Sequence, residues 1–151
     1  MGLTQRNRAE ITKYLQNYAK RIEEALVYIL EAFVEELINH AKSSAGYVDR
    51  TSNLKSSIGG YVVKDGRVIT HRGFVNEKGA SEGAQTGLEF INSLLAQHSK
   101  GYGIIIVAGM NYASYVENLY GLNVLKKTEL KAGSEFKRVL DRLKIQIDRA
   151  A

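Results

Sequence analysis

A long amphipathic helix at the start of the chain constrains the fold most. Apolar residues between positions 4 and 44 recur at steps of three and four, which predicts one helix. They are Ile11, Leu15, Tyr18, Ile22, Leu26, Ile29, Phe33 and Leu37, joined by Leu30, Val34, Ile38 and Ala41. At about 1.5 Å per residue the helix would reach ~60 Å, longer than a domain of this size is wide. We therefore expect residues 1–20 to project beyond the core. A break near Asn17, with the helix folded back, is the alternative.

A β-hairpin is predicted after this helix. Gly60 precedes two short apolar runs, residues 61–64 and 67–70, which flank Asp65-Gly66. This dipeptide is typical of a two-residue type I′ turn. The next segment, residues 71–87, holds four glycines among small and polar residues, so we expect a mobile loop that becomes helical from about Ser81.

The second half predicts a strand between two helices. Leu88, Ile91, Leu94 and Leu95 form one helical face that ends near His98. Residues 104–108 are apolar at every position, which indicates a strand covered on both faces. An extended piece at 122–125 and a helix from about Thr128 to Arg149 close the chain. The apolar stripe that predicts this last helix is Ala132, Phe136, Val139, Leu140, Leu143 and Ile147. The fold class is therefore α+β: a long N-terminal helix, a small mainly antiparallel sheet made of the hairpin and a central strand, and a middle and a C-terminal helix packed on it.

Composition restricts the class of protein. The chain of 151 residues is 44% hydrophobic, which suits a single domain, 1–151, with a real core. The absence of cysteine excludes disulfides and thiolate metal sites. No apolar run approaches the ~18 residues of a membrane span, and the start lacks the apolar region of a signal peptide. We expect a protein of a reducing cytosol without a membrane partner.

The net charge of +5 raises the question of nucleic acid. Residues 1–44 carry six basic and six acidic side chains, so their sum is neutral. The excess lies in 45–80 (six basic, three acidic) and 111–151 (eight basic, five acidic), where acids are interleaved with it. This pattern favours a solvated mixed surface over a phosphate-binding stripe. A small nucleic-acid-binding module remains the alternative function.

Residues that could carry catalysis are scattered. His40, His71 and His98 lack partners at metal-ligand spacing, and we expect His40 and His98 to stabilise helix ends. The stretch from Gly79 to Gly83 lacks the Gly-Lys-Ser/Thr ending of a phosphate loop. Glu89 and Glu117 are far apart in the sequence, and nothing in it pairs them as an acid and a base. We predict no catalytic residue, no cofactor and no metal; a small enzyme or ligand-binding protein is the weaker alternative.

Tyrosines suggest an interaction surface. The chain has nine Tyr, four Phe and no Trp. Tyr112, Tyr115 and Tyr120 lie within nine residues around Glu117, in a segment too short to bury three rings. Tyrosine suits interfaces because it combines a large area with a polar tip. Half-buried core packing is the alternative, and base stacking is a weaker one because no basic residue lies between Gly101 and Leu125.

Two segments together resemble a known family. Residues 49–58, Asp-Arg-Thr-Ser-Asn-Leu-Lys-Ser-Ser-Ile, are similar to the "DRTGNLRSSI" stretch of phage head–tail joining, or tail-completion, proteins. Residues 109–117, Gly-Met-Asn-Tyr-Ala-Ser-Tyr-Val-Glu, resemble the later "G-x-x-Y-A-x-Y-V-E" segment of that family. The order and the gap of about 50 residues also agree. After Glu117 this chain departs from the commoner pattern, since it has Asn-Leu-Tyr-Gly and no proline.

The resemblance implies a structural role in virion assembly without catalysis. Such proteins form rings, typically hexamers, in the neck of long-tailed phages and prophages. Partners would be further copies of the chain, the connector or head-closure protein, and the tail tube protein. The protein would occur in the host cytoplasm during assembly and in the virion neck afterwards.

We expect the ring to use parts of the chain that are unsatisfied alone. These are the projecting helix, the loop and the tyrosine cluster, because a ring joins different patches of neighbouring copies. The predicted interface residues are Phe74, Val75, Asn76, Glu77, Lys78, Tyr112, Tyr115, Glu117 and Tyr120. The sequence alone suggests that deleting residues 74–83 leaves a folded monomer that cannot assemble.

Overall fold

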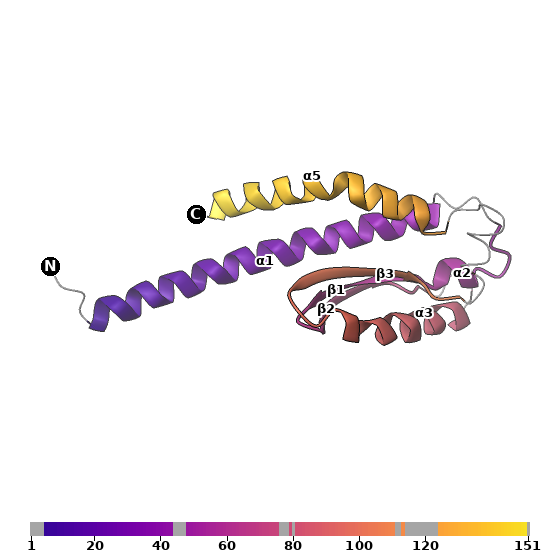
Figure 1. Cartoon of the computed structure of the whole chain (residues 1–151), viewed down its shortest axis with the longest axis horizontal. Coiled ribbons are helices and arrows are strands. Elements are labelled where there is room, and N and C mark those ends of the chain that lie inside the picture. Colours follow the sequence, from indigo (N-terminus) through magenta and orange to yellow (C-terminus); the bar gives the residue numbers. More distant parts are fainter. Residues whose placement is uncertain are drawn as a thin grey trace.

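The structure, a computed structural model, describes residues 5–43, 48–75, 79, 81–110, 113 and 124–150. In chain order its elements are α1 (Gln5–Ser43), α2 (Asn53–Ser56), β1 (Ile58–Lys64), β2 (Arg67–Gly73), α3 (Ser81–Leu94), a 3₁₀ helix (Leu95–Gln97), β3 (Tyr102–Ala108) and α5 (Lys126–Ala150). The molecule is elongated, and the N-terminal part of α1 extends well beyond the other elements (Figure 1). The predicted α+β class and the predicted order of elements are confirmed.

Helix α1 is one continuous helix of 39 residues, so a break near Asn17 is wrong. Its apolar periodicity is constant, but burial begins late. Residues 5–17 are all exposed, and Ile29 is the first buried side chain. From there the buried side chains follow the predicted broad stripe, and they are Ile29, Phe33, Val34, Leu37, Ile38 and Ala41.

The sheet is antiparallel, with β1 between β2 and β3. Asp65 and Gly66 have φ of 50° and 77°. Positive φ at both central residues defines the type I′ turn that was predicted from this dipeptide. Strand β2 runs to Gly73, beyond the predicted end at residue 70. Arg72 and Gly73 pair with Gly60 and Gly59 near the start of β1. Residues 71–73 are His, Arg and Gly and give no apolar signal. Their strand conformation therefore follows from the pairing with β1.

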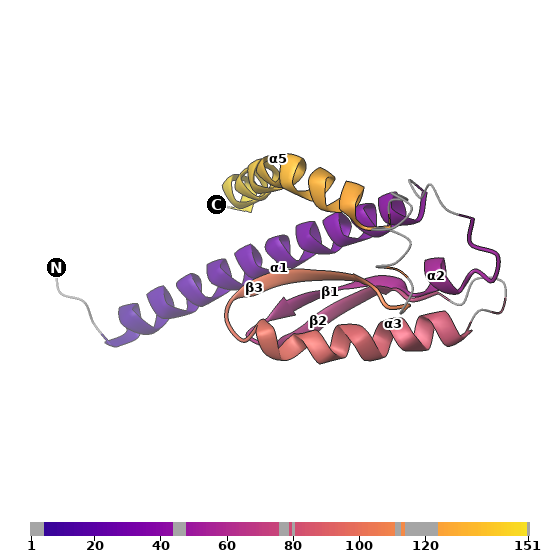
Figure 2. The same ribbon diagram turned by 45° about the vertical axis from the view of Figure 1, so that its right-hand side comes forward.

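The two faces of the sheet are covered by different helices. Ile58 and Val62 of β1 pack on the α1 side, together with the neighbouring Ile104 of β3. Tyr61, Val63, Ile105 and Val107 point the other way and pack with Ile91 of α3. Figures 1 and 2 show α3 on one face of the sheet and α1, with α5 beyond it, on the other. The prediction that the strand at 104–108 is covered on both faces is therefore confirmed.

The prediction of a glycine-bearing loop over 71–87 was too long. Strand β2 occupies its start, and α3 begins at Ser81, the residue from which a helix was predicted. Gly83 and Gly87 lie inside α3 and are buried. A Cβ at Gly83 would lie 2.0 Å from the carbonyl oxygen of Asn53. These glycines permit close helix packing, a tertiary requirement that looks like loop composition in the sequence.

Helix α5 starts at Lys126, two residues before the predicted start, and runs back beside α1 (Figure 1). Near its start, the Thr128 hydroxyl lies 3.0 Å from Nδ1 of His40 on α1. The structural role predicted for His40 thus includes a bond between two helices. Val124 and Leu125 form a bend instead of the predicted extended piece, whose other two residues lie outside the described part of the chain.

Candidate functional site

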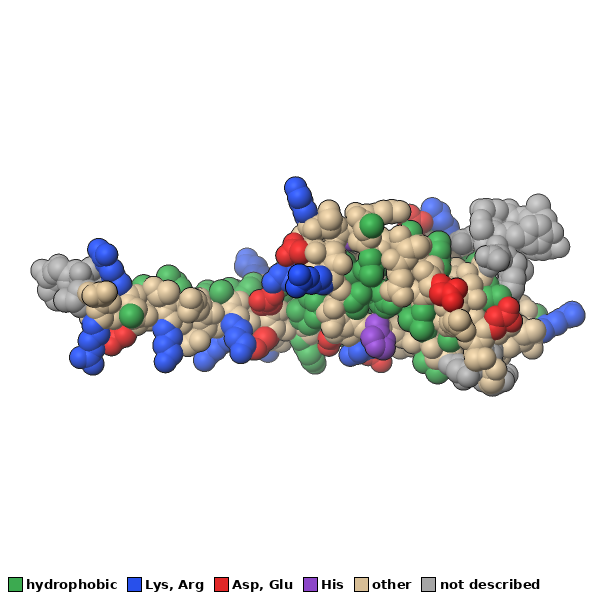
Figure 3. Space-filling model, turned by 90° about the horizontal axis from the view of Figure 1, so that it is seen from below, with side chains coloured by type: hydrophobic (Ala, Val, Ile, Leu, Met, Phe, Trp, Pro, Cys, Tyr) green, Lys and Arg blue, Asp and Glu red, His purple; other side chains and the backbone are tan. Residues whose placement is uncertain are grey.

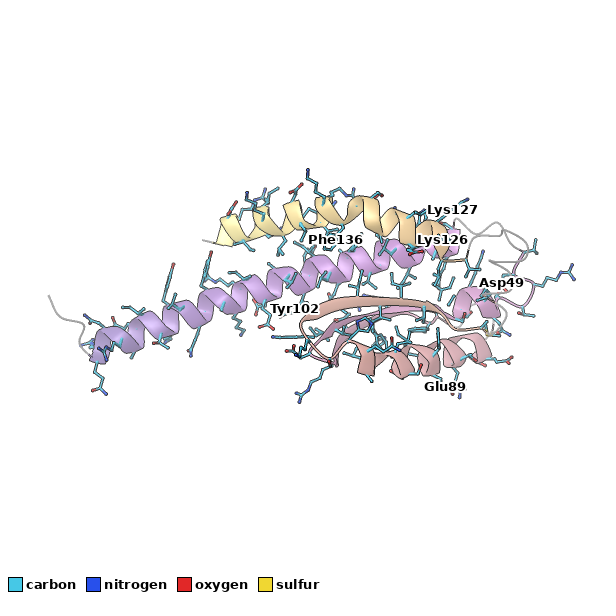
Figure 4. The ribbon with its side chains drawn as sticks, viewed as in Figure 1. Asp49, Glu89, Tyr102, Lys126, Lys127 and Phe136 are labelled. Carbon is cyan, nitrogen blue, oxygen red and sulfur yellow. The ribbon has the colours of Figure 1, made fainter. Side chains whose placement is uncertain are left out.

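The first segment that carries the family resemblance lies against the described residues of the second, Gly109, Met110 and Ala113. Residues 48–57 connect α1 to the sheet, and α2 forms within them. Asp49 accepts a hydrogen bond from the amide of Lys55 at 2.8 Å, which closes this connection (Figure 4). Leu54 packs with Ala113, and the amide of Gly109 donates to the carbonyl of Ser57 at 3.2 Å. The first motif and the described residues of the second, Gly109, Met110 and Ala113, therefore lie together beside the sheet and α3.

Gly109 explains part of the second motif. A Cβ at this position would lie 2.3 Å from the Cα of Gly87 in α3. The backbones of these two glycines touch, which brings the end of β3 close to α3. A side chain at either position would separate the two elements.

Two of the predicted interface residues lie in the described part of the chain, and they differ in exposure. Phe74 is 9% exposed, and its ring meets Tyr61 edge-on with the centroids 6.2 Å apart. Val75, the next residue, is 56% exposed. Asn76, Glu77, Lys78, Tyr112, Tyr115, Glu117 and Tyr120 lie outside the described residues.

Phe74 also changes what a deletion of residues 74–83 would do. Its ring fills the space above Gly59 and Gly87, since a Cβ on either would lie within 2.7 Å of it. The deletion would remove this core ring and the first turn of α3. From the structure we expect this deletion to disturb the fold, so single substitutions are the proper probe.

The N-terminal part of α1, residues 5–22, which we call the arm, carries exposed apolar side chains. It carries the seam Ile11, Leu15, Tyr18 and Ile22. Ile11 is 48% and Leu15 57% exposed. The steps of four, three and four between these residues are typical of a narrow helix–helix contact. The described part of the chain offers the arm no partner for this seam.

Charges on α1 are separated, which the neutral sum over residues 1–44 concealed. Residues 5–21 hold five basic side chains and one acidic one, whereas residues 22–36 hold five acidic and no basic ones. Figure 3 shows Lys and Arg along the extended part of α1, and hydrophobic side chains gathered over the body. Counting charge along successive turns would have revealed this division from the sequence.

The acidic half of α1 is largely neutralised within the chain. Glu31 pairs with Arg72 of β2, and Glu36 pairs with Lys131 and Arg138 of α5. Glu23, at the base of the arm, accepts hydrogen bonds from Lys64 and Tyr102. These bonds hold the pKa of Glu23 below its ordinary value of 4.5, because Lys64 and then Tyr102 stabilise the charged carboxylate. Within the arm Arg6 pairs with Glu10, and Lys20 pairs with Glu24 of the acidic half. The arm still keeps a net positive charge, whereas four of the five glutamates of the acidic half are paired.

An apolar groove lies between α5, β3 and α1. Leu26, Ile29 and Phe33 of α1 and Tyr102 to Ile104 of β3 line it, together with Phe136, Val139, Leu140 and Leu143 of α5. Phe136 lies on the side of α5 that faces α1 (Figure 4), yet it is 53% exposed, and Leu140 is 48% exposed. Strand β3 is also an edge of the sheet, with no strand beyond it in the described residues. The groove is therefore open to a partner.

Helix α3, unlike the arm, carries acidic and no basic side chains. Ser81–Leu94 contains Glu82 and Glu89 and no basic residue. Glu89 lies on the outer side of α3 (Figure 4), near the exposed Phe90. Glu117, the other carboxylate named from the sequence, lies outside the described residues. Among those that are described, no group of three His, Cys, Asp or Glu could hold a metal ion.

The fold is α+β, and the exposed seam, groove and charged faces are surfaces suited to contact with other proteins. The model of the family described as "Bacteriophage HK97-gp10, putative tail-component" matches residues 9–118. The match covers well over half of the chain, which therefore belongs to the HK97-gp10-like family. Comparison with curated proteins and with solved structures found no match. No helix in the described ranges is long and apolar enough to cross a membrane.

Family membership makes the chain a structural phage protein of the tail-component class, which interacts with other virion proteins. It also confirms the resemblance drawn from residues 49–58 and 109–117, since both segments lie within the matched range.

Proposed function

We propose that this protein acts in the neck of a long-tailed phage, where it joins the head connector to the tail tube as a ring of identical copies, typically six. The single observation that carries the proposal is an arm with an apolar seam on a chain of the phage tail-component family. An exposed seam of this kind requires a partner, because helices bury their apolar stripes in the folded assembly. We also propose that residues 1–151 work as one domain.

The proposal is tested by mixing purified protein with its tail tube protein and following the mass by light scattering, with negative-stain microscopy of the product. We expect a closed ring that binds the end of the tail tube. The connector or head-closure protein should then bind the opposite side of the ring. A chain that stays monomeric in the presence of both partners would contradict the proposal.

We further propose that the predicted interface residues contribute to this assembly. Val75 supplies the exposed apolar contact, and the buried ring of Phe74 fixes its position. Residues 76–78 and Tyr112, Tyr115, Glu117 and Tyr120 would extend the contact. Val75→Asp should leave the midpoint of thermal unfolding unchanged and abolish ring formation. Val48→Asp, at a position 86% exposed, is the matched control and should assemble normally.

Nucleic-acid binding is a second candidate, because residues 5–21 hold five basic side chains against one acidic one. Such binding weakens steeply with salt, since cations released from the phosphates drive it. A gel shift with duplex DNA at about 50 and about 200 mM salt tests this candidate. It compares the wild type with a triple variant, Arg6→Gln, Lys13→Gln and Lys20→Gln. Equal weak binding by both proteins would exclude this candidate.

A further inference from the structure

We propose that the arm of one copy packs along α5 of a second copy, seam against the exposed apolar side of that helix. The inference rests on the proposed ring and specifies the contact that builds it. Two apolar surfaces of this chain carry it, each with side chains exposed to solvent, and they lie on different elements. The first is the seam of the arm, Ile11, Leu15, Tyr18 and Ile22. The second, which we call the α5 stripe, consists of the exposed Phe136 and Leu140 and the half-buried Leu143 and Ile147; Leu143 also touches the chain's own core.

The two surfaces have the same spacing. The seam runs in steps of four, three and four residues over positions 11–22, and the α5 stripe does so over positions 136–147. At about 1.5 Å per residue each is ~16 Å long. Residues in this pattern interdigitate between two helices as knobs and holes. These steps read the same in both directions and permit either orientation; the proposed contact is the parallel one, which places Leu15 beside Leu140 and every seam residue opposite a stripe residue.

The seam also continues a contact that the chain already makes. Ile29, Phe33 and Leu37 of α1 pack with Val139 of α5 in one cluster. Ile22 and Leu15 lie one and two heptads before Ile29, on the same side of the helix. The face of α1 that binds α5 within one copy is thus extended by the arm past the end of that α5. A helix of the same character from a second copy would cover it.

Three of the five cations of the arm lie away from this contact. Lys13 follows Ile11 by two residues, which turns it by about 200° around the helix. Arg6 and Lys20 lie seven residues to either side of Lys13 and therefore share its face. When the seam packs on α5, these three side chains point to solvent. Arg8 and Arg21, the other two cations of the arm, lie closer to the seam, because Arg8 is seven residues before Leu15 and Arg21 is next to Ile22.

The arm and the α5 stripe are distinct parts of one chain, so the contact is heterologous. Each copy gives its arm to one neighbour and receives the arm of another. A repeated contact of this kind closes into a ring when its rotation permits, and otherwise continues as a filament. The groove beside the stripe, lined by Ile29, Phe33 and Ile104, would be covered by the incoming arm.

Cysteine pairs test the contact cleanly, because the chain has no cysteine. One protein carries Leu15→Cys and a second carries Leu140→Cys, and the mixture is oxidised mildly. We expect a disulfide-linked heterodimer at least tenfold faster than in either of two matched mixtures. The first replaces Leu140→Cys by Leu130→Cys, at a position on α5 that is 64% exposed. The second replaces Leu15→Cys by Lys13→Cys on the opposite face of the arm.

Equal linking rates in the three mixtures would overturn the inference, as would faster linking of Leu15→Cys to itself, which would indicate arms paired with arms. Light scattering of the wild type separates this failure from that of the proposed function. A ring without the Leu15–Leu140 link contradicts the contact alone. Absence of both the link and the ring, with tail tube protein present, contradicts both.

Discussion

The two halves of α1 share one amphipathic pattern and have opposite environments. Residues 23–43 lie between the sheet and α5, and six of their side chains are buried. Residues 5–22 continue the same periodicity with no buried side chain and an opposite charge. The packed half is held by tertiary contacts. The arm needs none to begin, because a helix that continues an existing one avoids the cost of nucleation.

This comparison separates stability from function on a single helix. A substitution in the packed half acts on the free energy of unfolding. A substitution in the arm acts on whatever the arm binds and leaves the body intact. Pairs of variants with the same chemistry, one in a packed and one in an open position, therefore test the assignment of each region.

The largest effect is expected from the pair Leu37→Ala and Leu15→Ala. Leu37 is 1% exposed and Leu15 57%. Removing a buried leucine leaves a cavity, and we expect Leu37→Ala to lower the free energy of unfolding by about 3 kcal/mol. Leu15→Ala should change it by less than ~0.5 kcal/mol. Urea unfolding followed by circular dichroism measures both. A loss of ~2 kcal/mol or more in Leu15→Ala would mean that the arm folds onto its own body.

A second pair compares glycines in packed and open helices. A Cβ at Gly83 of α3 would lie 2.0 Å from a backbone oxygen, whereas nothing lies within 4 Å of one at Gly133 of α5. We expect Gly83→Ala to destabilise the fold by about 1–3 kcal/mol, because α3 must move away from Asn53. Gly133→Ala should stabilise it by up to ~1 kcal/mol, since alanine favours helix. We expect the unfolding midpoint to fall in Gly83→Ala and to rise in Gly133→Ala. A rise in the midpoint of Gly83→Ala would contradict the close packing of α3.

These pairs also show where sequence reasoning succeeded. The periodicity of α1, the Asp65-Gly66 turn and the apolar run at 104–108 predicted their elements, because each signal is local. The loop predicted over 71–87 included Gly83 and Gly87, although a helix was expected from Ser81, because the reason for these glycines is a backbone in another segment. Strand β2 was predicted too short, because its last residues owe their conformation to pairing with β1.

The candidate site divides in the same way. The seam and the projection of the arm follow from a local pattern, and they were predicted. The charge division within α1 was missed because its two halves cancel in the sum. The exposed side of α5 could not be predicted, since the stripe that predicted this helix includes Phe136 and Leu140, and only the structure shows that these stay exposed while Val139 is buried.

The smallest effect is expected at the base of the arm, where Glu23 joins the two halves. Lys64 and Tyr102 donate hydrogen bonds to its carboxylate and lower its pKa in the folded protein. The folded state then binds this proton less readily than the unfolded state. The stabilisation is fully present above about pH 4.5 and is lost as the pH falls through the lowered pKa. The Glu23→Gln variant should therefore unfold at slightly lower urea than the wild type at pH 7. At pH 3 the two midpoints should approach each other. Because the pair is largely exposed, salt should reduce the difference at pH 7. A difference that grows towards acid would show that the carboxylate is not held in its charged form by these two donors.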